Sequence, residues 1–176
     1  MKRHFDDDLK KLNDALVRMA GLAQESITQA IDALKNRDKA LALRVIDNDK
    51  EIDQLEIDIE ELAIDLLALH QPMAKDLRFI TNALKINAEL ERIADLAVNI
   101  SQRVLDIADQ PLLKPLVDIP KMTEVAKNMV GKVIDSFINR DENLAKEVIL
   151  MDPEADQYRD LIYRETMHDY LLKDPQ

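Results

Sequence analysis

Apolar residues recur every three or four positions along most of the chain, which is the spacing of helices that bury one face. The first apolar stripe consists of Leu9, Leu12, Leu16, Met19, Ala23, Ile27, Ala30, Ile31 and Leu34. It predicts one long helix, with Asp6 to Asp8 placed favourably near its positive N-terminus.

The tripeptide Asn-Arg-Asp at 36–38 interrupts this stripe. Asp38 is a candidate N-cap for a second, short helix that is predicted to end near Asn48. A third helix is predicted from about Asp49 to His70.

A fourth helix is predicted to open at Pro72 and to continue to about Asp109. The segment 110–120 follows, and its three prolines are typical of a linker. The predicted organisation is a first helical bundle at 1–109, the linker at 110–120, and a second helical bundle at 121–176.

The part of the chain after the linker repeats the part before it. A shift of 103 positions places 36–38 on a second Asn-Arg-Asp at 139–141 without a gap. The same shift aligns Leu41-Ala42 with Leu144-Ala145, Val45-Ile46 with Val148-Ile149, and Pro72 with Pro175. These are not heptad positions, so composition alone does not explain the match, and we infer a duplication.

The register of the repeat predicts that the second unit is incomplete. The counterpart of the fourth helix would begin at Pro175, and the sequence ends at Gln176. The expected fold is therefore all-α, with two tandem repeats of a three-helix bundle, the second lacking its last helix. The second half is expected to be dynamic, self-associated, or packed against the first bundle or another chain, because its apolar stripes lack one wall.

Composition excludes several functions. A net charge of −11, 3% aromatic residues and no Trp argue against nucleic-acid binding. There are no Cys and only 2 Gly, which excludes thiol chemistry and a glycine-rich phosphate loop. No apolar run is long enough for a membrane span or a signal peptide.

Candidate chemistry appears in "NAELERIADLAVNI" at 87–100, where Glu91 and Asp95 stand one turn apart in mid-helix. They share the face of Leu84 and Ala88, which is otherwise apolar, and an unpaired buried carboxylate costs several kcal/mol. Two explanations remain open. Either they pair with basic residues such as Lys85, Arg92 or Arg103, or they face a bound partner.

A second acidic pair, Asp49 and Asp53, is repeated as Asp152 and Asp156. Helix capping is one explanation, because helix N-termini favour Asp. If the helices of 49–70 and 72–109 are antiparallel neighbours, however, the first pair lies level with Glu91 and Asp95. Oxygen ligands of this kind suit cations such as Mg, Mn and Fe.

Two other classes of protein compete with this interpretation. The first is a metal-carboxylate oxidoreductase or metal store on a helical bundle, but paired Glu-x-x-His motifs are missing, and only Glu165 to His168 matches once. His70 and His168 are interpreted as ordinary helix-end residues. The second is a purely structural helical repeat, which would hold no metal.

Five segments resemble the PhoU family of bacterial phosphate-signalling proteins over the whole length of the chain. They are Phe5 to Leu9, "NRD", "DKEIDQLE", "QPMAKDLRFI" and "ELERIADLAVNI". The resemblance implies two tandem three-helix bundles, with carboxylates that bind Fe, Mn, Mg or Zn. By that resemblance Asp49, Asp53, Glu91 and Asp95 form one metal site, and Asp152 and Asp156 are half of a second.

The resemblance also implies a function. Members of this family are cytoplasmic negative regulators, commonly homodimeric, that link the ATPase of the phosphate ABC transporter to a sensor histidine kinase. They repress the phosphate-starvation response when phosphate is plentiful. The chain is thus expected to be an adaptor and not an enzyme.

Overall fold

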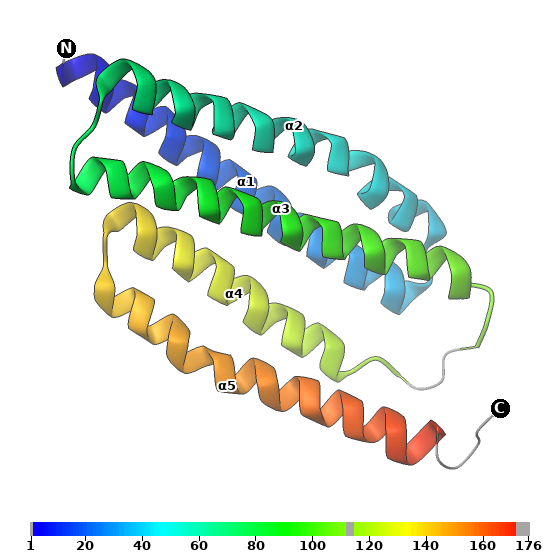
Figure 1. Cartoon of the computed structure of the whole chain (residues 1–176). Helices are drawn as coiled ribbons and strands as arrows, with labels where there is room; N and C mark the ends of the chain where they lie inside the picture. Colours follow the sequence, from blue (N-terminus) through cyan, green and yellow to red (C-terminus); the bar gives the residue numbers. More distant parts are fainter. Residues whose placement is uncertain (1, 112–114, 172–176) are drawn as a thin grey trace.

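The computed structural model describes residues 2–111 and 115–171, and every regular element in these ranges is a helix. Three long helices lie side by side, the second running antiparallel to the first and the third, and two shorter ones follow them below (Figure 1). The elements are α1 (Lys2–Asn36), α2 (Lys39–His70), α3 (Lys75–Ile107), α4 (Asp118–Asn139), α5 (Glu142–Glu165) and a π-helical segment, η1 (Thr166–Leu171). The predicted all-α fold is confirmed.

The predicted break near Asn48 is wrong, because α2 is continuous from Lys39 to His70. Val45 and Ile52 lie two turns apart on its buried face, and most of the polar residues between them are exposed. The apolar phase is therefore unbroken.

Other boundaries also differ from the prediction. α1 begins at Lys2, so Asp6 to Asp8 lie inside the helix. α3 begins at Lys75, three residues after Pro72. α4 begins at Asp118, within the predicted linker. Pro175 and Gln176, on which the expected incompleteness of the second unit rests, lie outside the described residues.

The core of the first bundle is formed by large side chains from all three helices. Each such residue contributes about 1.5–3 kcal/mol on burial. The residues are Leu12, Leu16, Met19, Ile52, Ile59, Leu66, Ile80 and Leu90.

The repeat is confirmed at the turn that joins the first two helices of each half. Arg37 and Arg140 both adopt a left-handed backbone, with φ of 56° and 55°. The next residue, Asp38 or Asp141, caps the following helix, accepting from the amide of Leu41 at 2.9 Å or Leu144 at 3.1 Å. The duplicated tripeptide therefore builds the same turn twice.

The second half packs against the first bundle. Val130, Ile134 and Phe137 of α4 join the core of the first bundle, and Gln24 of α1 donates to the carbonyl of Lys127 at 2.6 Å. α5 packs on α4 and has one buried residue, Val148. Among the arrangements expected for the second half, the structure has the one in which it packs against the first bundle.

Two apolar grooves separate α5 from the first bundle, with volumes of about 350 and 590 Å³. The smaller is lined by Ile86 and Ile93 of α3 with Val148. The larger lies between Ile31 of α1 and Ile162 of α5. Across the described ranges, none of the helices combines the length and the apolar character needed to cross a membrane.

Candidate acidic cation site

The predicted ligands of the first bundle lie on two neighbouring helices. Asp49 and Asp53 are on α2, and Glu91 and Asp95 are on α3. Capping does not explain the first pair, because α2 begins at Lys39 and its N-cap is Asp38. Because α2 is continuous, Asp49 and Asp53 do not cap the start of a helix, which was the alternative explanation from the sequence.

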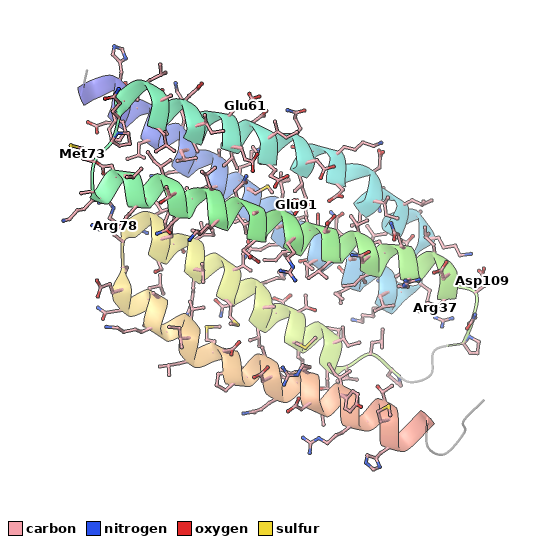
Figure 2. All side chains as sticks on the ribbon, viewed as in Figure 1. Arg37, Glu61, Met73, Arg78, Glu91 and Asp109 are labelled. Carbon is pink, nitrogen blue, oxygen red and sulfur yellow. The ribbon has the colours of Figure 1, made fainter. Side chains whose placement is uncertain are left out.

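Helices α2 and α3 bring these carboxylates to the same level. The side-chain amide of Asn87 donates to the carbonyl of Glu56 at 3.0 Å, which fixes one turn of α3 against one turn of α2. The acidic residues follow within two turns on each helix, and Glu91 lies midway along α3 (Figure 2). The two pairs therefore lie at the same height along the two helices, as predicted.

Electrostatics add Glu56 to the set. Burial, and then the charges of Asp53 and Asp95, raise the pKa of Asp49 to about 6. The pKa of Glu56 is also raised, first by burial and then by the charges of Glu60, Asp53 and Asp95.

The pKa of Glu91 is raised by burial and then by the charges of Asp95, Glu56, Asp53 and Asp49. We call these five residues the acidic cluster: Asp49, Asp53, Glu56, Glu91 and Asp95. Glu56 was not among the ligands predicted from the sequence. Its signal was its position three residues after Asp53.

No basic side chain of the described residues forms an ion pair with the acidic cluster. Arg103, one of the partners considered from the sequence, pairs instead with Asp106 at 3.4 Å. Lys85 and Arg92 form no ion pair within the described ranges. The structure therefore does not support the explanation that Glu91 and Asp95 are paired with basic residues.

The face that carries Glu91 differs from the expected one. Glu91 is half-buried, while Ala88 and Asp95 are exposed. The face of α3 that enters the bundle contains Asn87 and Leu90 instead. The predicted apolar surroundings of both carboxylates are thus wrong, and partial exposure lowers the cost of their charge.

The donor set is chemically suited to a hard cation, since it consists of carboxylate oxygens with no competing positive charge. In the described part of the chain, no three acidic or histidine side chains already surround a common point. Metal binding would therefore need these surface side chains to turn toward a shared ion.

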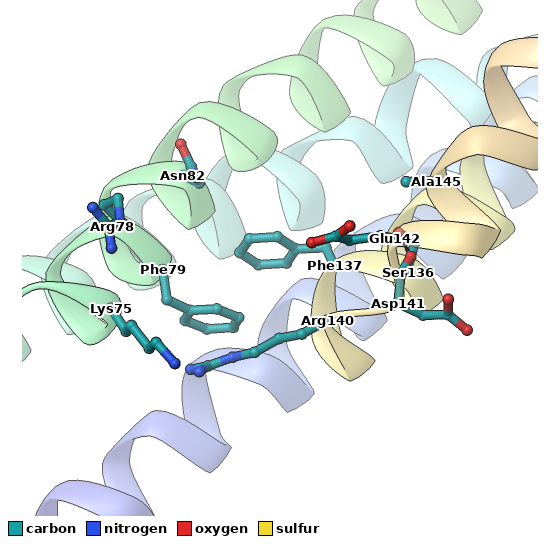
Figure 3. Close-up of a pocket in the computed structure, with 10 residues that line it drawn as sticks. All are labelled: Lys75, Arg78, Phe79, Asn82, Ser136, Phe137, Arg140, Asp141, Glu142 and Ala145. Carbon is teal, nitrogen blue, oxygen red and sulfur yellow. Dashed lines mark hydrogen bonds between the residues drawn. The ribbon is translucent and has the colours of Figure 1, made fainter.

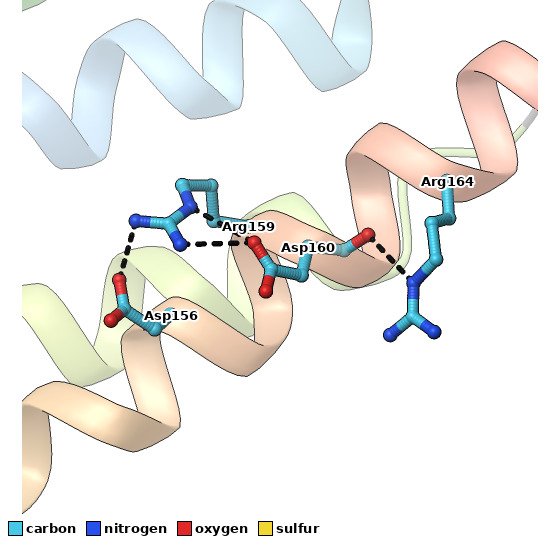
Figure 4. Close-up of polar contacts among 4 residues, drawn as sticks. All are labelled: Asp156, Arg159, Asp160 and Arg164. Atoms are coloured by element: carbon cyan, nitrogen blue, oxygen red, sulfur yellow. Dashed lines mark hydrogen bonds and ion pairs between the residues drawn. The ribbon is translucent and has the colours of Figure 1, made fainter.

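The second half presents its acidic pair in a different environment. Asp156 accepts from Arg159 at 2.6 Å, and the same guanidinium contacts Asp160 at 2.9 Å (Figure 4). The charge of Asp152 also acts on Arg159. Asp152 and Asp156 both lie on α5, which in the described ranges packs on α4 and not on α2 or α3. The structure therefore does not bring them to the acidic cluster.

The histidines have other surroundings. His70 ends α2, lies 3.4 Å from Asp8 and contacts the edge of Phe5. His168 belongs to the π-helical segment after α5. The interpretation of His70 as a helix-end residue is confirmed.

A separate cleft of about 510 Å³ lies between the start of α3 and the α4–α5 turn (Figure 3). Arg140 stacks over Phe79 at 5.3 Å, and its guanidinium lies 3.5 Å from Asp76. The cations Lys75 and Arg78 also line the cleft. Asp141 and Glu142 line it as well, so its charges are mixed.

Fold and site together define a helical repeat protein with an acidic face between two helices. The chain belongs to the PhoU family, because residues 16–104 and 119–176 match the PhoU domain.

The chain is 43% identical over 168 residues to a phosphate-specific transport system accessory protein PhoU homolog of Aquifex aeolicus. This match covers 96% of the chain and 76% of that protein. A homolog of the same description from Zymomonas mobilis is 36% identical over 97% of the chain and 71% of its own length.

Solved structures agree with the sequence matches. The crystal structure of PhoU from Pseudomonas aeruginosa matches with a TM-score of 0.89 and 30% identity, covering 97% of this chain and 82% of that one. The phosphate transport system regulatory protein PhoU from Streptococcus pneumoniae matches with a TM-score of 0.86 and 28% identity, covering 97% and 79%.

Proposed function

We propose that this protein is a regulatory accessory protein of phosphate-specific transport. The observation that carries the proposal is family membership over both halves of the chain, with relatives described as accessory proteins of that system. In its finer form, the protein is a negative regulator that links the ATPase of a phosphate ABC transporter to a sensor histidine kinase. It acts as an adaptor and carries out no chemical step.

The proposal includes cation binding by the acidic cluster. Carboxylates without ion pairs in the described part of the chain, at the same height on two neighbouring helices, support it. Burial first, and then mutual repulsion, raise the pKa of Asp49 and Glu91, and a cation would offset both costs of their charge. Asp49, Asp53, Glu91 and Asp95 are the proposed ligands, with Fe, Mn, Mg or Zn as the ion. Asp152 and Asp156 are the weaker half-site of the second repeat.

The proposal also includes self-association as a homodimer. The exposed apolar side chains of α5 support it, since Ile149 is 70% and Leu150 is 78% exposed. Apolar side chains of this size on one short helix favour a protein interface over a solvated surface.

A genetic test addresses the regulatory role. In a bacterium that lacks its own accessory protein, phosphate-starvation genes are expressed even in phosphate-rich medium if the protein is a negative regulator. Expression of this chain should restore repression, and pull-down with the transporter ATPase should recover it. Restored repression by an unrelated helical bundle, or none by this chain despite normal expression, would contradict the role.

A further inference from the structure

Asn87 is a fully buried polar residue in an apolar layer of the first bundle. Its side chain is completely inaccessible, and its neighbours on the same face of α3 are Ala83 and Leu90. The amide nitrogen donates to the carbonyl of Glu56 at 3.0 Å, while the amide oxygen has no partner within the described residues. Asn87 therefore makes one bond between helices and leaves one acceptor unsatisfied.

Stability alone does not account for this residue. A buried acceptor without a partner loses its hydrogen bonds to water, which costs more than a typical hydrogen bond contributes. Leucine, which has a similar length, would fill the same layer without that cost. Buried polar residues in helical bundles are better explained as devices that fix register.

The apolar packing of α3 defines its register unevenly along the helix. From Ala94 to Ser101 the buried residues are all small, whereas Leu90 before them is large. A slip of one helical turn, about 5.4 Å, replaces one small residue by another in this part of the interface. A directional bond to a single carbonyl separates the two registers, whereas alanine contacts do not.

The bond of Asn87 lies next to the acidic cluster on both helices. Glu56 is itself a member, and Asp53 lies one turn away from it on α2. Glu91 lies one turn beyond Asn87 on α3. A one-turn slip would therefore change which carboxylates of α2 lie level with those of α3.

We propose that Asn87 is a positioning residue, which holds α3 on α2 in the register that sets the two acidic stripes level. Its effect on cation affinity rests on the proposed cation site, whereas its effect on register does not. The two effects are measured separately.

The test uses the full chain with Asn87→Leu, and Ser101→Ala as the matched control. Ser101 is also fully buried on α3 with an unpartnered hydroxyl, but it makes no bond to α2. Asn87→Leu should keep or raise thermal stability and weaken Mn²⁺ binding by about tenfold or more, as loss of a supporting residue does. Ser101→Ala should leave Mn²⁺ affinity unchanged.

Register is read from the distance between spin labels at Glu61 and Arg92, which are exposed on α2 and α3. These sites lie well out of level, so axial slip changes the distance directly. We expect one narrow distance in the parent and in Ser101→Ala, and a shift or second population of several ångströms in Asn87→Leu. Should Asn87→Leu not fold, Asn87→Ala gives the same reading.

An unchanged distance distribution in the folded Asn87 variant would overturn the proposal, whatever its metal affinity. If the parent itself binds no Mn²⁺, the cation site fails, and the distances still decide the role of Asn87. If the distance changes and Mn²⁺ affinity falls in the same variant, both the register role of Asn87 and the cation site are supported.

Discussion

The two halves of the chain build the same turn and then use the helix after it differently. α2 buries seven residues, from Ala42 to Leu66, whereas α5 buries Val148 alone. α2 packs on both α1 and α3, whereas α5 packs on α4 and adjoins open apolar grooves. A helix sequence is thus repeated, but its burial depends on the neighbours that cover it.

The acidic pairs differ for a second reason. Asp53 is followed three residues later by Glu56, and Asp156 by Arg159 at the equivalent position. Glu56 adds a negative charge to the acidic cluster, while Arg159 pairs with Asp156. The same Asp-x-x-x-Asp motif is therefore without an ion pair among the described residues in one half and paired with an arginine in the other.

The largest expected effect concerns burial at matched positions. Ile59 is fully buried in α2, and its counterpart Ile162 is half-buried beside a groove. Ile59→Ala should lower the free energy of unfolding by about 2–5 kcal/mol, and Ile162→Ala by less than about 1 kcal/mol. Urea unfolding measures both. Equal losses would show that α5 is as well packed as α2.

The second-largest effect is expected on cation affinity, when Glu56 and its counterpart Arg159 are exchanged. Glu56→Arg places in α2 the charge that α5 has, so Mn²⁺ affinity should fall by about tenfold or more. The same change should lower the pKa of Glu91, because a charge that raises it is replaced by one of opposite sign. Carboxyl-detected NMR titration measures that pKa.

Arg159→Glu is the reciprocal control for this exchange. It removes the partner of Asp156 but supplies no facing helix, so Mn²⁺ affinity should rise little. A gain equal to the loss in Glu56→Arg would mean that α5 alone makes a site, and the role of α3 would be wrong.

The smallest effect is on the pH dependence of stability. The pKa of Asp49 is about 6 in the folded chain and about 3.9 when unfolded, so the folded state binds the proton more tightly. Without metal, stability should therefore fall as pH rises from about 4 to about 6 and level off above.

Asp49→Asn should reduce this dependence, leaving the part that comes from Glu56 and Glu91, and raise stability at pH 7. The gain should be a few tenths to about 1 kcal/mol, since solvent screens the partly exposed group. Urea unfolding at pH 4.5, 6 and 7.5 in the presence of a chelator measures both chains. A parent curve that rises across this range would contradict the raised pKa.

Much of the fold could be predicted because it depends on local signals. Asp38 and Asp141 cap helices wherever the tripeptide occurs, and the apolar stripe of α1 has the helical period throughout. The level of the acidic pairs followed from antiparallel packing at a constant rise per residue.

The remaining features depend on which faces are covered. α3 has two apolar faces, one in the bundle and one with Ile86 and Ile93 toward α4. A helical wheel does not distinguish them, so Ala88 was wrongly placed inside the bundle. The break predicted near Asn48 falls where several polar residues follow one another, although the buried residues keep their phase through them.

The central claim is that α2 and α3 of the first half form the cation site. Equilibrium dialysis of the full chain against Mn²⁺, followed by elemental analysis, tests it most directly. The parent should retain the ion, Glu91→Gln with Asp95→Asn should lose it while folding normally, and Asp152→Asn with Asp156→Asn should retain most of it. Equal retention by the parent and the Glu91 and Asp95 variant would contradict the claim.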